Sequence, residues 1–318
     1  MRFKKFDLNL LVALDALLAE RSVARAAARL NLSPSATSDA LARLREHFGD
    51  PLLLQVGRRM EPTARADALR DAVRDLLVQL DHTISAEPAF DPARSERTFR
   101  IYVSDYTQMV LGPHLVARAA AARCSAAFDF LPQVAQPQRD LERGEADVLI
   151  LPQNLMSPDH PHEPLYEEGF VCVAWQGGAL ARGTLTRERY LDAGHVVMRP
   201  QSTGPASSYE DWFVRRLGVE RRVAATSYGF ATVAALLVGT DHVATMHASL
   251  ARLLATTWPL VVRPCPVEIP PMTQAMQWHR ARAQDSGLEW LRGVLRASAD
   301  ELAKSLPGTP GRRGRRAT

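Results

Sequence analysis

The stretch from residue 20 to residue 65 constrains the fold of this chain more than any other part. Two short, alanine-rich helical patterns meet there at the break Leu30-Asn31-Leu32-Ser33-Pro34. In each pattern the apolar residues recur at helical spacing and therefore fall on one face. Ser33 can cap the second helix, Pro34 suits its first turn, and Gly49 suits its end. Because small alanines let two helices cross closely, the segment predicts a helix-turn-helix.

Signals of a wing follow directly after this helix pair. Asp50-Pro51 predicts a turn, residues 52–54 predict a short apolar strand, and Gly57-Arg58-Arg59 predicts the tip of a hairpin. Residues 20–65 also carry eight arginines against five acidic residues, a balance that suits a phosphate backbone. A generic helix pair with a solvated arginine face is the alternative. The wing favours a winged helix-turn-helix, whose tip arginines reach a phosphate or an adjacent minor groove.

The second helix of the pair is the expected recognition helix. With Leu41 and Leu44 toward the core, its opposite face carries short polar side chains that can bond to base edges or phosphates. Asp39 has two interpretations: it accepts a hydrogen bond from cytosine N4, or it pairs with Arg43 four residues later. The side chains predicted to contact DNA are Ser33, Ser35, Thr37, Ser38, Asp39, Arg43, Arg58 and Arg59.

An apolar stripe marks residues 63–86, a helical stretch that Thr63 can cap. Its spacing of three or four residues resembles the heptad seam of a two-stranded coiled coil. Packing on the head's own core is the alternative, but residues 1–62 already contain a core of their own. We therefore expect a dimerisation helix that presents two recognition helices about one DNA turn apart. The stripe consists of Leu69, Val73, Leu76, Leu80 and Ile84.

The composition and the apolar pattern of the sequence change after residue 86. Residues 87–97 are rich in proline and charge and predict a hinge. Residues 98–305 alternate short apolar runs with helical stretches, which predicts α/β units. The expected strands are 99–103, 127–131, 148–151, 170–175, 195–198, 242–246, 260–264 and 273–279. The expected helices are 107–122, 138–143, 207–217, 230–238, 248–254 and 287–303, and residues 306–318 predict a disordered basic tail.

Composition excludes several classes of protein. The 318 residues carry a net charge of only +4, so any contact with nucleic acid must be local. The absence of a leader-like start and of an 18-residue apolar run predicts a cytoplasmic bacterial protein without membrane contact. Cys124, Cys172 and Cys265 are widely spaced, which suits a reducing compartment better than disulfides or a zinc site.

Motifs of catalysis and of cofactor binding are missing. The sequence contains no phosphate-binding loop, dinucleotide fingerprint, zinc-protease helix or nucleophile elbow. Asp159-His160-Pro161-His162 is a candidate for metal ligands, but an exposed loop explains it more simply because proline disturbs the geometry of the imidazoles. We expect no enzyme, no cofactor and no metal site.

Longer motifs occur in a fixed order between Met1 and His279. They are MRFKKFDLNLLVALDALLAER, ALARLREHFGDPL, MEPTARADAL, FRIYVSDY, RGEADVLILP, MSPDHP, LYEEGFVCVAW, ATM and QWH. In these motifs the chain resembles LysR-type transcriptional regulators, in particular the nodulation-regulator-like (NodD-like) branch that includes regulators of aromatic degradation. The recognition helix departs from the usual Gln-Pro-Ala-hydrophobic-Ser run, because it has Pro34-Ser35-Ala36-Thr37-Ser38 instead. No relative's operator sequence can therefore be transferred.

The resemblance implies an α/β fold with an N-terminal all-α winged helix-turn-helix (1–62) and a long linker helix (63–86). A two-lobed regulatory domain like the periplasmic binding proteins then spans 98–305. The chain would cross between lobes near 167–169 and 266–271, which gives lobe one about 98–167 and 270–305, and lobe two about 168–269. The resemblance also implies a homotetramer (a dimer of dimers), promoter DNA and RNA polymerase as partners, and activation by flavonoid or phenolic effectors.

An effector site is expected where strands end and helices begin, at residues 103–107, 199–205 and 228–230. Free N–H groups and hydroxyls at such places suit a carboxylate or phenolate oxygen, and aromatic or methionine side chains supply walls. The alternative is that these residues only cap helices and fill cores. The predicted effector-binding residues are Ser104, Tyr106, Thr107, Gln153, Met156, Met198, Gln201, Ser202, Thr203, Tyr228 and Phe230.

Two functions remain compatible with these features. The first is a transcription regulator that responds to a small aromatic effector between the two lobes. The second is a DNA-binding regulator without a ligand, whose C-terminal half serves only for oligomerisation. The N-terminal head and the missing leader disfavour a third, a solute-binding protein or an enzyme built on the same two-lobed fold.

Overall fold

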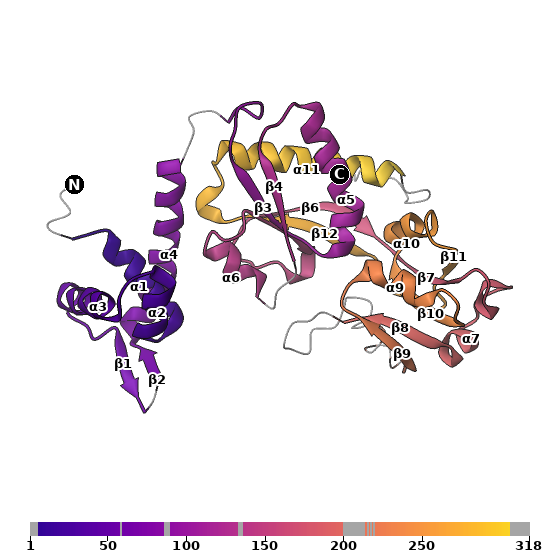
Figure 1. Ribbon diagram of the computed structural model, residues 1–318, viewed down its shortest axis with the longest axis horizontal. Coiled ribbons are helices and arrows are strands. Elements are labelled where there is room, and N and C mark those ends of the chain that lie inside the picture. Colours follow the sequence, from indigo (N-terminus) through magenta and orange to yellow (C-terminus); the bar gives the residue numbers. More distant parts are fainter. Residues whose placement is uncertain are drawn as a thin grey trace, which may run out of the picture. The chain divides into compact units, whose positions relative to one another are not determined.

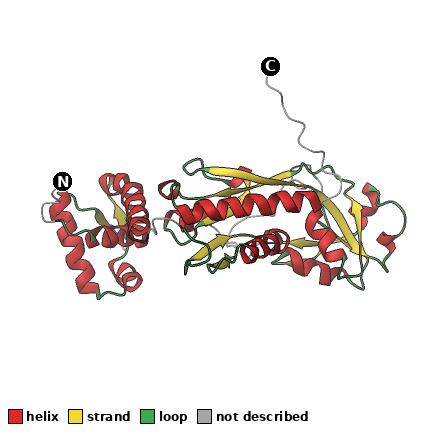
Figure 2. Cartoon of the chain, turned by 90° about the horizontal axis from the view of Figure 1, so that it is seen from above, coloured by secondary structure: helices red, strands yellow, loops and turns green. Residues whose placement is uncertain are grey.

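The computed structural model describes residues 6–57, 59–85, 90–132, 136–199, 214, 216, 218 and 220–305. The chain divides into two compact units, Met1–Glu87 and Pro88–Thr318. Helices dominate the first unit, whereas strands and helices alternate along the second (Figure 2). Arg58, residues 201–203, most of the helix expected at 207–217, and the tail at 306–318 lie outside the described residues.

Unit 1 is a winged helix-turn-helix followed by a long helix (Figure 1). Its elements are α1 (Asn9–Glu20), α2 (Val23–Leu30), α3 (Pro34–Phe48), β1 (Leu53–Val56), β2 (Arg59–Pro62) and α4 (Ala64–Ser85). The expected caps are present: the Ser33 hydroxyl accepts the Ala36 N–H at 3.2 Å, and the Thr63 hydroxyl accepts the Ala66 N–H at 3.1 Å. Asn31, in the left-handed region at φ 54°, ends α2 and makes the turn.

The core of unit 1 explains why alanine is so frequent here. Ala26 and Ala27 on α2 are fully buried, which lets α2 approach α1 and α3 closely, and Leu44 on α3 fills the space between them. The wing strands β1 and β2 pair antiparallel from Leu53↔Pro62 to Val56↔Arg59.

Helix α4 corrects one of our expectations. Val73 is buried in the core of unit 1, and Leu69 packs partly against that core, so the first half of the stripe serves the head itself. Leu76 and Ile84 remain exposed, at 42% and 84%. The expectation that the whole stripe has no place within one chain was wrong, because α4 packs along α1. Of this stripe, the exposed Leu76 and Ile84 are the members left for a partner.

Unit 2 has two lobes, each built on a five-stranded sheet. The sheet of lobe one has the order β4-β3-β5-β12-β6, in which β3 runs parallel to β4 and β5, and β12 runs antiparallel to β5 and β6. The elements of lobe one are β3 (Thr98–Tyr102), α5 (Asp105–Ala121), β4 (Ala127–Leu131), α6 (Pro137–Glu142), β5 (Val148–Pro152), η1 (Gln153–Leu155), β6 (His162–Glu168), β12 (Met272–Gln277), η3 (Arg280–Arg282) and α11 (Ser286–Ser305).

Lobe two has the sheet order β11-β7-β10-β8-β9. Its elements are β7 (Phe170–Trp175), η2 (Ala179–Ala181), α7 (Arg187–Asp192), β8 (Gly194–Met198), β9 (Val223–Ser227), α9 (Phe230–Leu237), β10 (His242–His247), α10 (Ala248–Ala255) and β11 (Leu260–Pro264). The chain passes from lobe one to lobe two at Gly169 and returns through residues 265–271, close to both crossovers expected from the resemblance. Helices α9 and α10 lie beside α5 where the two lobes meet (Figure 1).

Among the strands and α-helices of unit 2 that the structure describes, β6, α7 and β9 were not anticipated. Strand β6 reads HEPLYEE, and its proline and three glutamates hide the apolar signal of a strand. It pairs with β12 through a register shift at Gln274/Ala275, so tertiary contacts rather than local propensity define it. In the described part of the chain, none of the helices is both long and apolar enough to cross a membrane.

Candidate DNA interface and effector site

Helix α3 presents a polar face to solvent, as expected for a recognition helix. Leu41 and Leu44 point into the core, whereas Ser35, Ser38 and Asp39 are exposed near the start of the helix. Ser33 caps the helix, and its hydroxyl lies 2.9 Å from that of Ser35. The exposed side chains near the start of the helix are short, so they leave room for the helix backbone to approach the floor of a major groove.

Two details of α3 differ from the sequence interpretation. Thr37 is fully buried and its hydroxyl donates to the Ser33 carbonyl, so it stabilises the first turn rather than facing DNA. Arg43 pairs with Asp7 at 3.4 Å instead of with Asp39. The i,i+4 interpretation of Asp39 is therefore not what the structure has, and in the described residues Asp39 has no ion pair.

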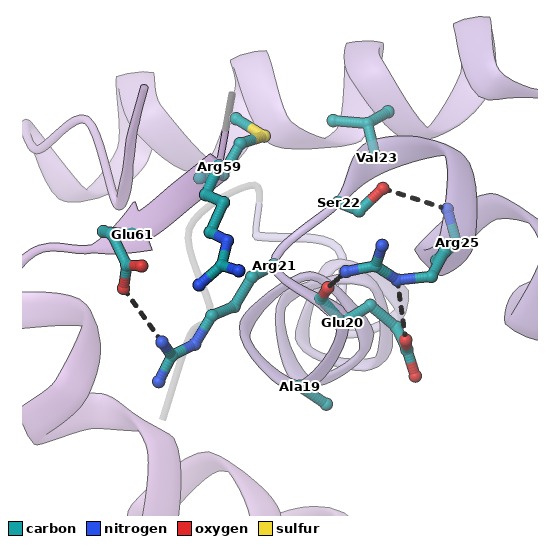
Figure 3. A pocket seen from close by; sticks show the side chains of 9 residues that line it. Ala19, Glu20, Arg21, Ser22, Val23, Arg25, Arg59 and Glu61 are labelled. Carbon is teal, nitrogen blue, oxygen red and sulfur yellow. Dashed lines mark hydrogen bonds and ion pairs between the residues drawn. The ribbon is translucent and has the colours of Figure 1, made fainter. Parts of the chain in front are cut away.

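A hollow of about 570 Å³ lies between the wing and the junction of α1 with α2 (Figure 3). Arg21, Arg25 and Arg59 line it, together with Glu20 and Glu61. Arg21 bonds to Glu61 at 2.8 Å and so ties the wing to the end of α1. Arg25 pairs with Glu20 at 3.5 Å, whereas Arg59 has no ion pair among the described residues. The positive charge of Arg59 is therefore uncompensated in the hollow, and its side chain extends toward Arg21 in Figure 3.

The base of the wing is held by Arg45 and Asp50. The Arg45 guanidinium donates to the carbonyls of Pro51 and Leu53 at 2.8 and 3.0 Å. Asp50 accepts the Thr63 hydroxyl and the Leu52 N–H, both at 2.7 Å, and these two hydrogen bonds lower the pKa of its carboxyl group. They hold Leu52 in the left-handed region at φ 58°. The two arms of the wing are thus fixed at their root.

The region where the lobes of unit 2 meet, here called the lobe junction, contains two carboxylates of lobe one at helix starts of lobe two. Asp105 accepts the Ala231 N–H at 3.0 Å, and the N-cap of that helix, α9, is Gly229, which has no side chain. Glu168 accepts the Ser249 N–H at 3.2 Å at the start of α10. Helices α9 and α10 of lobe two thus each obtain a hydrogen-bond acceptor and a favourable charge from the opposite lobe.

Glu168 is the centre of a buried polar cluster that has no signal in the sequence. It is 1% exposed and also accepts the Tyr106 hydroxyl at 2.7 Å and the Ser249 hydroxyl. Burial, with smaller effects of Tyr166 and Glu168, raises the pKa of Tyr106 well above its ordinary value, so that its hydroxyl stays a donor. A glutamate at a strand end is normally solvated, which is why this position was overlooked.

His247 completes the lobe junction from the lobe-two side. Its ring stacks on that of Tyr106 at 3.7 Å between centroids, with an interplanar angle of 6°. Burial lowers the pKa of His247 to about 3, so the ring is neutral at physiological pH. A neutral, flat ring between Tyr106 and Phe230 packs the two lobes together without a charge to solvate.

The structure sorts the predicted effector residues into three groups. Buried in the core or capping a helix are Ser104, Tyr106, Thr107, Met198 and Phe230. At least partly exposed are Gln153, Met156 and Tyr228. Outside the described residues are Gln201, Ser202 and Thr203. The first group corrects our expectation of aromatic and methionine walls, because apolar side chains next to a strand end fill the core here.

The expectation of free helix N-termini also needs correction. The start of α5 is closed by its own Ser104 hydroxyl, which accepts the Thr107 N–H at 3.1 Å. The start of α9 is closed by Asp105. In each of these two helices, one N–H of the first turn is therefore already bound to a protein oxygen.

Comparison with known proteins matches both units to one family. Residues 8–67 match the bacterial regulatory helix-turn-helix protein of the lysR family, and residues 92–300 match the LysR substrate binding domain. The chain belongs to the LysR family. The relatives of this LysR-family chain include Nodulation protein D 2 of Rhizobium tropici, 41% identical over 295 residues that cover 93% of each chain. Nodulation protein D 1 of Bradyrhizobium diazoefficiens is 38% identical, covering 98% of this chain and 99% of the relative.

Solved LysR-family structures have the same architecture. A probable transcriptional regulator of Pseudomonas aeruginosa superposes with a TM-score of 0.63 at 30% identity, covering 92% of this chain and 97% of that one. A full-length OxyR variant of the same organism superposes with a TM-score of 0.65 at 16% identity, covering 96% and 99%. The α/β fold with an N-terminal helix-turn-helix is thus confirmed, and the chain is a LysR-type transcriptional regulator.

Proposed function

We propose that this LysR-type regulator activates transcription when a small hydroxylated aromatic compound binds at the lobe junction, and that it acts on promoter DNA as a dimer of dimers. The observation that carries the ligand class is Tyr228, which is 70% exposed and directly precedes Gly229. A Cβ at Gly229 would lie 2.8 Å from an oxygen of Asp105. Tyr228 is thus the sequence neighbour of the residue that adjoins the Asp105 carboxylate, and we place its exposed ring beside that carboxylate.

The Asp105 carboxylate argues for a phenol rather than an acid. It already occupies the start of α9, so an anionic effector would meet a like charge instead of free N–H groups. A phenol hydroxyl can donate to Asp105 while its ring stacks on Tyr228. The match of residues 92–300 to the LysR substrate binding domain supports an effector-responsive role.

DNA contact is proposed for the exposed start of α3 and for the wing. Ser35, Ser38 and Asp39 would face base edges, and Ser33 and Arg43 would face the backbone. Arg59, whose charge has no ion-pair partner in the described residues, would bind a phosphate at the rim of the hollow, and Arg58, its neighbour in the sequence, would add a second positive charge. The exposed Leu76 and Ile84 of α4 would pair two such heads.

Calorimetry with matched aromatic ligands tests the effector class. A neutral phenol should bind at least about tenfold more tightly than the benzoate of the same ring pattern, a difference of roughly 1.4 kcal/mol. Tyr228→Ala should weaken phenol binding by a similar factor. Asp105→Asn should reduce the difference in affinity between the phenol and the benzoate. Leu253→Ala, which changes a 40% exposed residue of α10, is the control and should bind like the parent chain.

Two results would contradict the proposal. Tighter binding of the benzoate would show that Asp105 does not face the ligand. The absence of binding by any aromatic compound, with promoter binding and tetramer size intact, would favour the regulator whose C-terminal half serves only for oligomerisation.

A further inference from the structure

Lobe two contains two cysteines that the proposed function does not use. Cys172 lies on β7, and Cys265 is the first residue after β11. Strands β7 and β11 pair antiparallel, with Arg263 opposite Cys172 and Pro264 opposite Val171. Cys265 is therefore the diagonal neighbour of Cys172 on the same face, and both side chains pack in one apolar cluster of lobe two.

The surroundings of the two thiols differ. Cys172 is fully buried, and its sulfur lies 3.8 Å from the Thr245 hydroxyl, which in turn lies 2.9 Å from the hydroxyl of Tyr190. Cys265 is partly exposed. Cys265 is thus the less buried residue of the two.

The charge distribution favours a thiolate at Cys265. Hydrogen bonding from the Cys172 thiol, aided by the Val267 N–H and by nearby Arg221, lowers the pKa of Cys265 to about 7 against the opposing effect of burial. The same interaction, together with burial, raises the pKa of Cys172 well above its ordinary value. A thiolate at a partly exposed residue, next to a protonated partner, suits a peroxide-sensitive cysteine with its resolving cysteine.

We propose that Cys265 and Cys172 form a redox site, in which a hydroperoxide oxidises the pair to a disulfide across β7 and β11. The Cys265 thiolate attacks the peroxide oxygen, an S–O bond forms, the O–O bond breaks, and the leaving oxygen takes a proton and departs as water or an alcohol. The Cys172 sulfur then attacks the sulfenic acid, the S–S bond forms, and hydroxide leaves as water with the Cys172 proton. Two thiols are oxidised and one peroxide is reduced.

The second step becomes easier once the first has occurred. The Cys265 thiolate is the main reason that Cys172 holds its proton, and oxidation of Cys265 to an uncharged sulfenic acid removes it. Oxidation of Cys265 thus makes it easier for Cys172 to lose its proton and attack the sulfenic acid.

The position of the pair links this chemistry to the lobes. Cys172 is three residues after Gly169, where the chain enters lobe two, and Cys265 begins the segment 265–271 by which it leaves. Diagonal neighbours in an antiparallel pair are about 7–8 Å apart at Cα, whereas a disulfide needs about 4.4–6.8 Å. Because β11 ends at Pro264, closing the bond requires a shift that residues 265–271 absorb. Oxidation would therefore stiffen both crossovers between the lobes.

The test uses the full-length reduced chain and hydrogen peroxide, with differential alkylation and mass spectrometry. We expect a peptide cross-linked through Cys172 and Cys265, reversed by dithiothreitol. At pH 7, loss of the Cys265 thiol should be roughly ten times faster than loss of the Cys124 thiol. Hydrogen exchange in residues 265–271 should slow on oxidation and recover on reduction. Absence of the cross-link, or equal rates at Cys265 and Cys124, would overturn the proposal, and unchanged exchange would remove its link to the crossovers.

Three variants separate the roles of the thiols, each checked for native circular dichroism. Cys172→Ser should accumulate a sulfenic acid at Cys265 that a dimedone probe traps, because the resolving thiol is gone. Cys265→Ser should leave Cys172 reduced, since the buried thiol does not meet peroxide directly. Cys124→Ser is the matched control and should cross-link like the parent chain. Oxidation of Cys172 in the Cys265→Ser variant at the parent rate would show that Cys265 is not the entry point.

Discussion

Replacing Asp105 with alanine tests whether lobe one caps a helix of lobe two. The substitution removes the acceptor that lies 3.0 Å from the Ala231 N–H, and Gly229 at the N-cap of α9 cannot replace it. Loss of an N-cap side chain costs roughly 0.5–2 kcal/mol. Loss of a negative charge near the start of a helix adds about 0.3–1 kcal/mol. We expect the first turn of α9 to be destabilised by about 1–3 kcal/mol.

Hydrogen exchange followed by mass spectrometry measures the destabilisation of α9 locally. Thermal unfolding of the whole chain does not, because the chain has two units. Exchange at the start of α9 should accelerate roughly 5- to 150-fold in Asp105→Ala, because about 1.4 kcal/mol corresponds to a factor of ten. Asp105→Asn should recover part of the protection, since its amide oxygen still accepts. Asp129→Ala, at an exposed position of β4, is the control and should exchange like the parent chain.

The Gly229→Ala substitution tests the contact between Asp105 and α9 from the lobe-two side. Its Cβ would lie 2.8 Å from the Asp105 carboxylate oxygen, so that carboxylate must move away from α9. Gly229→Ala should therefore speed exchange as Asp105→Ala does, but should add little to it in the double variant, a coupling that a double-mutant cycle measures. Additive effects, or parent-like exchange in Asp105→Ala, would refute the cross-lobe cap.

Three other perturbations probe separate parts of the molecule. Arg59→Ala should weaken promoter binding and reduce the magnitude of the slope of log affinity against log salt by about one unit. The control Arg252→Ala, on α10, should leave this slope unchanged. An unaltered slope for Arg59→Ala would exclude a phosphate contact. Because the folded pKa of His247 is about 3 and an unfolded histidine titrates near 6.5, the unfolded state binds the proton first, so stability is lost as pH falls below about 6.5. His247→Phe should flatten the fall in the free energy of unfolding between pH 6.5 and 4.5 by about 2 kcal/mol in denaturant titrations, and an equally steep fall would place the titrating group elsewhere. Replacing the exposed Leu76 and Ile84 with aspartate should halve the particle size in light scattering without a loss of helicity, and a full-size assembly would show that α4 does not pair chains.

Much of the architecture follows from local signals in the sequence. The caps at Ser33 and Thr63 mark the starts of α3 and α4, and alternating apolar runs mark most strands of unit 2. Strand β6 escaped because three glutamates and a proline mask it, and only its pairing with β12 makes it a strand. Local patterns report secondary structure well where the chain's own propensity decides it.

The candidate site was harder to predict, for a physical reason. An apolar residue next to the end of a strand can line a pocket or fill the core, and periodicity does not distinguish the two. Tyr106, Met198 and Phe230 fill the core, whereas Tyr228 does not. Glu168 and Asp105 gain their roles from helices more than 60 residues away in the chain. Such contacts have no local signature in a single sequence.

The position of β12 in the sheet of lobe one also determines the order in which the lobes can fold during synthesis. Strand β12 lies between β5 and β6 in the sheet but leaves the ribosome only after all of lobe two. At ordinary rates of synthesis, roughly 100 residues take on the order of ten seconds. During that time β5 and β6 have exposed edges and lack their shared neighbour. Lobe two, which is continuous in sequence, can fold first. Lobe one is therefore the part of the nascent chain that most needs protection from aggregation.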